Sequence, residues 1–374
     1  MSAAEQRVER EVVVVLGGTG TIGQYLVPRL CALLPTLPHS LTHPHTHIVR
    51  VVSRDVHKAS VMFAPLGSFT HSHTHSGDSK AEAKALARED VTLQLVQGDV
   101  HDLASMQESF TDATRVFLLT LTSLMQQQVV VERRLLALLG NSPEHGGGSI
   151  EGLKLKHIVR LSAHSRGMEG QPSNSPFRWH SECDEQLLQA CSERGVLCGT
   201  ASTVAVTILR PSLFMQDMTR RHFAPLIVSK DIFYQLGCAP SSGAGVGAVF
   251  EDRYRIAMVD ARDIADVAAC VLSEDTTKHA YNTYILSGPR ALLWGDVAAA
   301  ISHVCGRQIK ADLLSDKAFY DHFGGSHVYL KQMQAYRSGC GEDVDGDIEV
   351  VTGRPARSIE EFCSDFVSSW VSSS

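Results

Sequence analysis

Four glycines follow an apolar run near the start of the chain, and their spacing is suited to binding a phosphate group. They are Gly17, Gly18, Gly20 and Gly23. The last three satisfy the spacing G-x-G-x-x-G, and the first, third and fourth satisfy G-x-x-G-x-x-G. A diphosphate can approach the main chain there because no Cβ blocks it, and the N–H groups of Thr21 and Ile22 would face the anion from the start of a helix.

The glycines are predicted to join a buried strand to a helix. Val12–Leu16 is a short unbroken apolar run, typical of a strand covered on both faces, and Thr21–Leu34 then has helical spacing. Glycine turns also end many strands that bind nothing, so a purely structural turn is the alternative. The order strand, turn, helix at the first strand favours a nucleotide-binding turn.

Strands and helices continue to alternate after this turn. Further strands are expected at Ile48–Ser53, Val91–Gln97, Val116–Leu119, Ile158–Leu161 and Val204–Leu209. Helices are expected at Leu124–Leu139 and Phe177–Glu193. This alternation predicts an α/β fold with a doubly wound parallel sheet, in which ligands bind outside the carboxyl ends of the strands.

The ends of the second and third strands carry candidate nucleotide contacts. Ser53 ends the second strand, and Arg54 and Asp55 follow it. A basic residue there accommodates the 2′-phosphate of NADP, whereas an acidic residue binds the ribose 2′-hydroxyl of NAD, so we expect NADP, with NAD as the alternative. After the third strand, Asp99 is placed to accept a hydrogen bond from the adenine amino group, whereas Asp102 is expected to cap the next helix.

The composition excludes some partners. A formal net charge of -7 argues against nucleic acid and anionic membranes, and no apolar run reaches the length of about 18 to 20 residues that spans a bilayer. The nine cysteines include no C-x-x-C pair, which indicates reduced thiols inside a cell. Only eleven residues precede Val12, which leaves little room for a targeting peptide, so a cytoplasmic location is expected.

Four segments together resemble the NmrA-like family of the atypical short-chain dehydrogenase/reductase superfamily. They are VVVVLGGTGTIGQYL, TILRPSLFMQDM, YRIAMVDARDIADVAACVL and VVTGRPARSIEEFCSDF, and the likeness extends from Val12 to about Trp370. The resemblance implies a Rossmann domain that binds NAD(P) and a smaller carboxyl-terminal α/β region that closes a substrate cleft. The aspartates of the third segment are expected to serve structure, since an aspartate at a helix start is usually a cap.

The resemblance also implies contacts for each part of the cofactor. The pyrophosphate would contact Gly17, Thr19, Gly20, Thr21 and Ile22, and Arg54 would bind the 2′-phosphate. Adenine would lie between Asp99 and Val100, and the ribose would be flanked by Leu119 and Thr120.

The Rossmann domain is expected at residues 11–212, and residues 213–374 are expected to form mainly the substrate cap, with 254–273 returning to the Rossmann domain. Histidine-rich segments at 35–47 and 67–79 interrupt the first domain. Alternate histidines can bind zinc, nickel or copper, but no cysteine or carboxylate lies at ligand spacing, so we expect polar insertions and no metal site.

The carboxyl-terminal region is less informative. A strand is expected at Asp231–Leu236 and an amphipathic helix at Trp294–Cys305, whereas Ser241–Gly247 is a glycine-rich linker or a lid. Four apolar side chains are expected in the core of the cap, with a pocket lining as the alternative. They are Phe319, Phe323, Tyr329 and Met333.

Ordinary members of the superfamily reduce carbonyls with a tyrosine acid, whose pKa is lowered by a lysine four residues later. No tyrosine of this sequence has a lysine at that spacing, and the corresponding place after the fifth strand holds His180, with Asp184 four residues on. His180 is a candidate acid or substrate-orienting group, and Ser162, where the fifth strand ends, is a candidate hydrogen-bond donor to the reacting atom. The alternatives are a packing role for His180 and a capped turn at Ser162.

Two functions of different classes fit these residues. The first is an NADPH-dependent reductase of an electrophilic small molecule, such as a quinone, an enone or an iminium, to which hydride adds with little acid assistance. The second is a redox sensor that binds NAD(P) without consuming it and regulates a protein partner through different affinities for its states. A scaffold without a cofactor is the third alternative.

Overall fold

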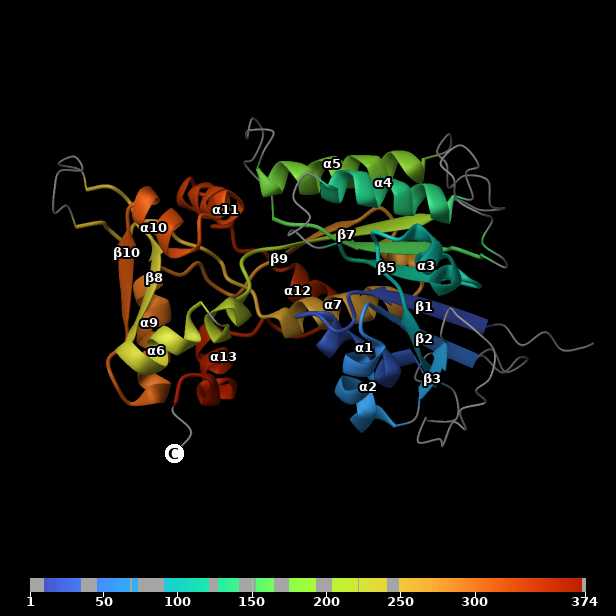
Figure 1. The fold of residues 1–374 in the computed structure, drawn as a ribbon, viewed down its shortest axis with the longest axis horizontal. Helices are drawn as coiled ribbons and strands as arrows, with labels where there is room; N and C mark the ends of the chain where they lie inside the picture. The colour runs from blue at the N-terminus through green and yellow to red at the C-terminus, as the bar shows by residue number, and fades with distance from the viewer. Residues whose placement is uncertain are drawn as a thin grey trace, which may run out of the picture. The chain divides into compact units, whose positions relative to one another are not determined.

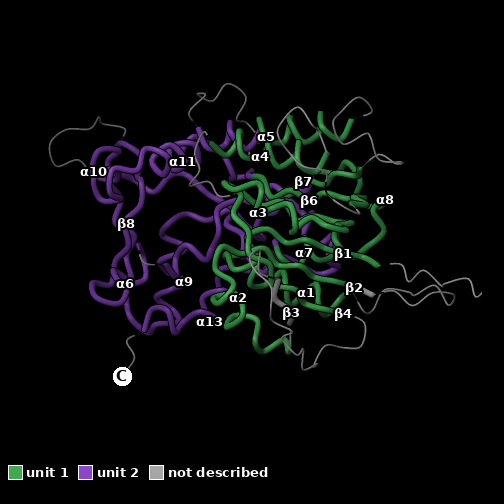
Figure 2. Tube along the Cα trace, turned by 45° about the vertical axis from the view of Figure 1, so that its right-hand side comes forward, with its two compact units in different colours: residues 1–162, 182–209, 265–283 green, residues 163–181, 210–264, 284–374 purple. Residues whose placement is uncertain are grey.

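The computed structural model of the protein describes residues 10–34, 46–67, 69–72, 91–120, 127–140, 150, 153–164, 175–192, 204–220, 222–240 and 249–371. The chain divides into two compact units (Figure 2). The first consists of residues 1–162, 182–209 and 265–283, and the second of residues 163–181, 210–264 and 284–374.

The predicted doubly wound parallel sheet is confirmed, and it has eight strands in the order β3-β4-β2-β1-β5-β6-β7-β9. The strands are β1 (Arg10–Leu16), β2 (Thr46–Ser53), β3 (Phe69–Ser72), β4 (Val91–Gln97), β5 (Arg115–Leu118), β6 (His157–Leu161), β7 (Ala205–Pro211) and β9 (Thr283–Leu286). Every pairing between β3 and β7 is parallel. The strand order reverses beside β1, which lies between β2 and β5, and such a switch point is where open α/β sheets bind ligands.

Helices cover both faces of this sheet, with α4 and α5 on one face and α1, α2 and α7 on the other (Figure 1). The helices that follow its strands are α1 (Gly23–Leu33), α2 (Val56–Phe63), α3 (Leu103–Gln107), α4 (Gln127–Leu139), α5 (Pro176–Ala190), α7 (Ala261–Ser273) and α8 (Thr276–His279). Because both faces are covered, the apolar run of β1 is buried, and Val12, Val13, Val14 and Val15 expose no surface.

The histidine-rich segments differ from the prediction where the structure describes them. Within 67–79, which we expected to be a polar insertion, β3 pairs in parallel with β4 at the edge of the sheet. Edge strands are often short and polar, so the amino-acid composition of such a strand resembles that of a loop. Thr46 and His47, at the end of the segment 35–47, already belong to β2. The predicted insertion residues His39, His43, His45, His73 and His75 lie outside the described residues.

The second unit contains a parallel two-stranded sheet and a set of short helices. Its strands are β8 (Ile232–Leu236) and β10 (Lys310–Leu314), and its helices are α6 (Ala224–Lys230), α9 (Trp294–Cys305), α10 (Asp316–His322), α11 (His327–Arg337), α12 (Asp347–Thr352) and α13 (Ile359–Asp365). The predicted strand and amphipathic helix of this region correspond to β8 and α9. The predicted linker Ser241–Gly247 lies outside the described residues.

Aromatic side chains fill the core of the second unit. Phe319 and Met333 expose no surface, Phe323 exposes 8%, and Tyr329 packs against the same cluster, so the core interpretation of these residues is confirmed. Trp294 Nε1 donates to the Tyr254 hydroxyl (2.8 Å), so an indole N–H within this core has a partner.

Two aspartates at the start of α7 are fully buried and bind neighbouring groups. Asp260 accepts from Gln216 Nε2 (2.7 Å) and from Arg262 Nη2 (2.7 Å), and Asp263 accepts from the Arg357 backbone N–H (2.8 Å). These contacts agree with the structural role expected for the aspartates of this segment.

A buried histidine lies at the amino end of β6. The Thr207 hydroxyl donates to the His279 carbonyl oxygen (2.7 Å), so Thr207 Oγ1 must accept from His157 Nε2 at 2.8 Å. His157 Nδ1 has no partner among the described residues. Burial lowers the pKa of His157 to about 3, with smaller contributions from Arg115 and His279. The folded protein therefore holds His157 neutral.

Acid is expected to destabilise the protein through His157. An unfolded histidine has a pKa of about 6.5, so the unfolded state binds a proton below this pH and the folded state binds it only near pH 3. The contribution of neutral His157 to the free energy of unfolding is thus present above about pH 6.5, and it is lost as the pH falls. Between pH 7.5 and 5.5 the free energy of unfolding, measured by urea denaturation, should fall by about 1.4 kcal/mol more in the wild type than in His157→Gln. An equal fall in both proteins would contradict this assignment.

Candidate functional site

The glycine turn packs main chain against main chain. Gly20 N–H donates to the Gly17 carbonyl oxygen (2.9 Å), and Gly17 has a φ of +70°, which side-chain-bearing residues rarely adopt. A Cβ on Gly23 would lie 2.4 Å from the Gly17 oxygen and the Gly18 Cα, and a Cβ on Gly18 would lie 2.5 Å from Val51 Cγ1. Three of the four glycines are therefore required by the packing of the turn itself.

Gly20 differs from these three. It is exposed, its φ is not in the left-handed region, and a Cβ there would meet only the Gly17 oxygen, at 3.0 Å. The missing side chain at Gly20 thus leaves the main chain open to an approaching ligand. A diphosphate requires such room, although the contact with the Gly17 oxygen also favours glycine at this position.

The start of α1 offers hydrogen-bond donors to that open surface. Ile22 precedes the helix without a side-chain cap, and the first turn has no acidic residue. In the described part of the chain, the N–H groups of Thr19, Ile22 and Gly23 have no hydrogen-bond partner. Unpaired N–H groups and the positive end of the helix dipole together favour an anion, so these residues fit the diphosphate of a dinucleotide.

The end of β2 presents one basic side chain and one acidic side chain that is already bound. Asp55 caps α2, since its Oδ1 accepts from the Lys58 N–H (2.8 Å). The Ser53 hydroxyl donates to the Asp55 carbonyl oxygen (2.9 Å), and Ser53 is buried. Arg54 is exposed and forms no ion pair with the described residues. Asp55, the residue that favoured NAD, is therefore engaged by the helix.

Asp99 and Val100 follow β4 and are both half-buried. Asp99 Oδ1 accepts from the His101 N–H (3.0 Å), and the Asp99 N–H donates to Ser105 Oγ (2.9 Å). Asp102 accepts from the Ala104 N–H (3.1 Å), which confirms the predicted cap of α3. The adenine contacts of Asp99 and Val100 stay a prediction.

Thr120 follows β5 and belongs to a buried cluster of polar side chains. Its hydroxyl donates to Glu132 Oε1 and accepts from Gln128 Nε2 (3.0 Å), both on α4. Leu119, the other predicted ribose neighbour, lies against the turn, because a Cβ on Gly17 would be 3.0 Å from Leu119 Cδ2.

Arg160 joins this cluster to Ser162. The Arg160 side chain exposes no surface; its Nε donates to Glu132 Oε2 (2.7 Å) and its Nη1 to Asp184 Oδ1 (2.5 Å). The Ser162 hydroxyl donates to Asp184 Oδ2 (2.9 Å). Burial alone would lower the pKa of Arg160, but Glu132 and Asp184 outweigh burial and raise it. The guanidinium therefore stays charged inside the protein.

Arg160, Glu132 and Gln128 were missed in the sequence, although one signal pointed to them. A basic residue within the apolar strand run Ile158–Leu161 must be buried, and a buried charge requires a partner of opposite sign. The acids on the helices that follow β5 and β6 are the candidates for such a partner.

His180 lies on α5 one helical turn before Asp184, and it exposes 7% of its surface. The two residues therefore share a face of the helix. The shared helix face does not test whether His180 takes part in a reaction. The catalytic roles of His180 and Ser162 stay predictions.

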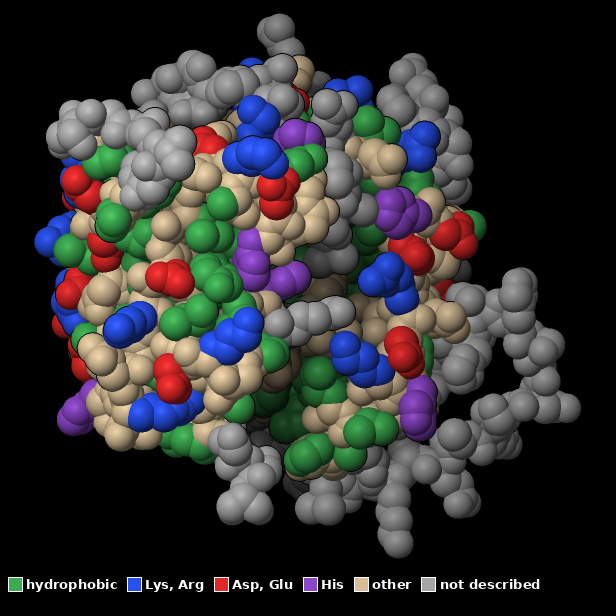
Figure 3. Space-filling model, turned by 60° about the vertical axis from the view of Figure 1, so that its left-hand side comes forward, with side chains coloured by type: hydrophobic (Ala, Val, Ile, Leu, Met, Phe, Trp, Pro, Cys, Tyr) green, Lys and Arg blue, Asp and Glu red, His purple; other side chains and the backbone are tan. Residues whose placement is uncertain are grey.

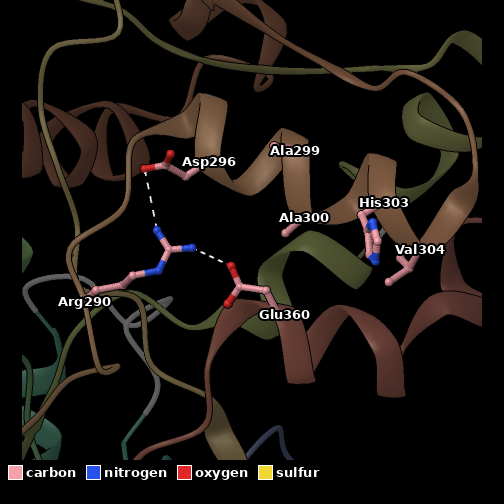
Figure 4. A pocket seen from close by; sticks show the side chains of 7 residues that line it. All are labelled: Arg290, Asp296, Ala299, Ala300, His303, Val304 and Glu360. Carbon is pink, nitrogen blue, oxygen red and sulfur yellow. Dashed lines mark hydrogen bonds and ion pairs between the residues drawn. The ribbon is translucent and has the colours of Figure 1, made fainter.

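A pocket of about 270 Å³ lies in the second unit, and none of the predicted site residues lines it. Figure 4 shows Arg290 between two carboxylates, with Glu360 at 2.5 Å and Asp296 at 3.9 Å, and His303 farther along α9. Because both acids already bind Arg290, this pocket does not resemble a phosphate site.

The described residues contain no group of three or more histidine, cysteine, aspartate or glutamate side chains arranged to hold a metal ion. Among the described helices, none combines the length and the apolar character needed to cross a bilayer. On the face drawn in Figure 3, basic and acidic side chains are interspersed.

The parallel sheet, with a glycine turn and a helix start beside its switch point, defines a protein of the Rossmann-like fold class. The predicted resemblance to the NmrA-like family is confirmed by the model of that family, which matches residues 9–137.

Two proteins of similar sequence are oxidoreductases by name. The chain is 26% identical over 284 residues to the NAD(P)H azoreductase of Xenophilus azovorans, a match that covers 72% of this chain and 81% of that protein. It is 27% identical over 173 residues to the uncharacterized oxidoreductase YesF of Bacillus subtilis, which covers 44% of this chain. That match spans only 55% of YesF.

Solved structures extend the likeness over nearly the whole chain. The NADPH-dependent quinone oxidoreductase QOR2 of Escherichia coli, complexed with NADPH, has a TM-score of 0.60 at 18% identity, covering 94% of this chain and 99% of that chain. NmrA, a negative transcriptional regulator, has a TM-score of 0.56 at 13% identity, covering 96% and 95%. At these identities the likeness establishes the fold.

A bulky residue at Gly20 is expected to abolish dinucleotide binding, because its side chain would occupy the open surface of the turn. Isothermal titration of Gly20→Val with NADPH should show no binding heat, whereas the wild type should bind. Gly346→Val is the matched control, since a Cβ at Gly346 meets nothing within 4 Å. Unchanged affinity in well-folded Gly20→Val would refute the phosphate-binding turn.

Proposed function

We propose that this protein is an NADPH-dependent reductase that transfers a hydride to an electrophilic small molecule such as a quinone, an enone or an iminium. The glycine turn supplies the diphosphate site of the cofactor. The fold likeness to a quinone oxidoreductase and the sequence similarity to an azoreductase support a reductase of this kind.

The observation that carries the choice of substrate class is the environment of Asp184. In ordinary members of the superfamily a lysine four residues after the tyrosine lowers the pKa of that acid. By the resemblance the lysine's place is taken here by Asp184, whose carboxylate binds Arg160 and Ser162. A site without that tyrosine and lysine is suited to acceptors whose reduction needs little proton donation during hydride transfer.

NADP is the proposed cofactor rather than NAD. Asp55 binds the start of α2, so the carboxylate that would accept from the 2′-hydroxyl of NAD is engaged. Arg54 is exposed at the end of β2 and has a guanidinium suited to the 2′-phosphate of NADP.

A redox sensor is the second candidate function. The fold likeness to the regulator NmrA supports it, and so does the hydrogen bond that ties the Ser162 hydroxyl to Asp184. In that case the protein would bind the dinucleotide without consuming it, and a protein partner would respond to its redox state.

The two functions differ in whether cofactor is consumed. Purified protein mixed with NADPH and a panel of quinones and activated alkenes should lose absorbance of the reduced nicotinamide only when an acceptor is present. The Gly20→Val protein is the control for non-enzymatic reduction. Tight NADPH binding with no acceptor-dependent loss across the panel would contradict the reductase and support the sensor.

Reversal of the charge at Arg54 is expected to weaken NADP more than NAD. A glutamate there repels the 2′-phosphate, so the Kd of Arg54→Glu for NADPH should rise by about tenfold or more, whereas the Kd for NADH should change by about twofold or less. Arg134→Glu, an equally large change at an exposed position on α4, controls for net charge. Equal weakening of both cofactors would mean that Arg54 does not contact the 2′-phosphate.

A further inference from the structure

The hydroxyls of Thr120 and Ser162 have no hydrogen left to donate to a ligand. Each hydroxyl carries one hydrogen, and Thr120 gives it to Glu132 while Ser162 gives it to Asp184. The two carboxylates are paired with the buried Arg160 guanidinium, and an ionised carboxylate accepts hydrogen bonds only. Both hydroxyl oxygens keep at least one lone pair, so they can only accept from a further group.

The two hydroxyls directly follow neighbouring strands, β5 and β6, at the edge of the sheet where the cofactor is proposed to bind. Leu118 of β5 is in register with Arg160 of β6, and Thr120 and Ser162 each follow two residues later. Parallel neighbours lie about 4.8 Å apart, so one ligand can reach both positions. More than nine-tenths of each residue is buried, and a ligand donor placed there would meet little competition from water.

We propose that Thr120 and Ser162 form an acceptor pair for the nicotinamide–ribose half of the cofactor, and that Arg160, with Glu132 and Asp184, positions this pair. The inference rests on the proposed function, since it requires a bound nicotinamide dinucleotide. The hydrogen-bond donors of that half are the ribose hydroxyls and the amino group of the carboxamide. We assign the ribose hydroxyls to Thr120 and the carboxamide amino group to Ser162.

In this assignment Ser162 accepts a hydrogen bond from the ligand, whereas the sequence led us to expect a donor. A donor to the reacting atom needs the hydroxyl hydrogen, which Asp184 accepts in the structure. As an acceptor, Ser162 instead fixes the orientation of the carboxamide and with it the plane of the nicotinamide ring. Arg160 acts through Asp184 and is a positioning residue.

A cofactor analogue tests the acceptor at Ser162. The 3-acetylpyridine analogue of NADP has a methyl group where the carboxamide has its amino group, so it cannot donate there. Titration calorimetry should show that the wild type binds the analogue about five to ten times more weakly than NADP. In Ser162→Ala the two ligands should bind with nearly equal Kd, because the acceptor is gone.

Two variants extend the test to the buried cluster. In Asp184→Asn the side-chain amide can donate to Ser162, which frees the hydroxyl hydrogen and should reduce the preference for NADP over the analogue to about twofold or less. Thr120→Val should raise the Kd of both ligands by a similar factor, about fivefold, because both carry the ribose hydroxyls. His157→Gln, a buried change at the opposite end of β6, should keep the wild-type preference.

The outcomes separate this inference from the proposed function. Equal Kd values of the wild type for NADP and the analogue would overturn the acceptor at Ser162 and leave the reductase standing, as would a preference retained in Ser162→Ala. A wild-type preference retained in folded Asp184→Asn would overturn the positioning role of the cluster. No binding of either ligand to the wild type would overturn both proposals.

Discussion

Helix α1 can begin where it does only because position 23 has no side chain. The Gly23 Cα lies so close to the turn that a Cβ would be 2.4 Å from the Gly17 oxygen and the Gly18 Cα. This contact fixes the start of α1 directly beyond β1, at the point where the strand order reverses. The N–H groups at that start, which have no partner among the described residues, therefore lie at the edge of the sheet where ligands of open α/β folds bind.

A second constraint acts on the opposite face of the sheet. Removing the Arg160 guanidinium from water is costly, and the cost is offset only if its partners hold it in good geometry. Those partners come from α4 and α5, so both helices must keep their register with β6. Apolar contacts of Leu135 and Leu187 would tolerate a small shift of the helices, whereas the ion pairs would not.

The strands were predictable because burial on both faces leaves a plain signal. The run Val91–Gln97 was placed with its observed bounds, and Ile158–Leu161 within one residue. The edge strand Phe69–Ser72 was missed, because an edge strand needs no apolar face and its residues are typical of a loop. The roles of individual side chains were harder to predict from the sequence. Asp55 and Asp102 each precede a helix in the same way, and only Asp102 was interpreted as a cap, although both are.

The buried cluster around Arg160 could not be predicted from local sequence patterns, because its members are distant in the chain. Arg160 lies 28 residues after Glu132 and 24 before Asp184, and nothing in the spacing joins them. Their contact depends on the packing of two helices on one strand. The position of each residue in its own element was predictable, but the pairing required the folded protein.

The same cluster disfavours a lysine at position 184 of α5. A lysine at position 184 would place an ammonium group beside the buried Arg160 guanidinium, and two like charges without solvent repel strongly. Glu132 alone could not offset both charges and still accept the hydrogen of Thr120. Asp184 thus supplies the second negative charge beside the Arg160 guanidinium. Any proton transfer at the proposed site would therefore use groups other than a lysine at position 184.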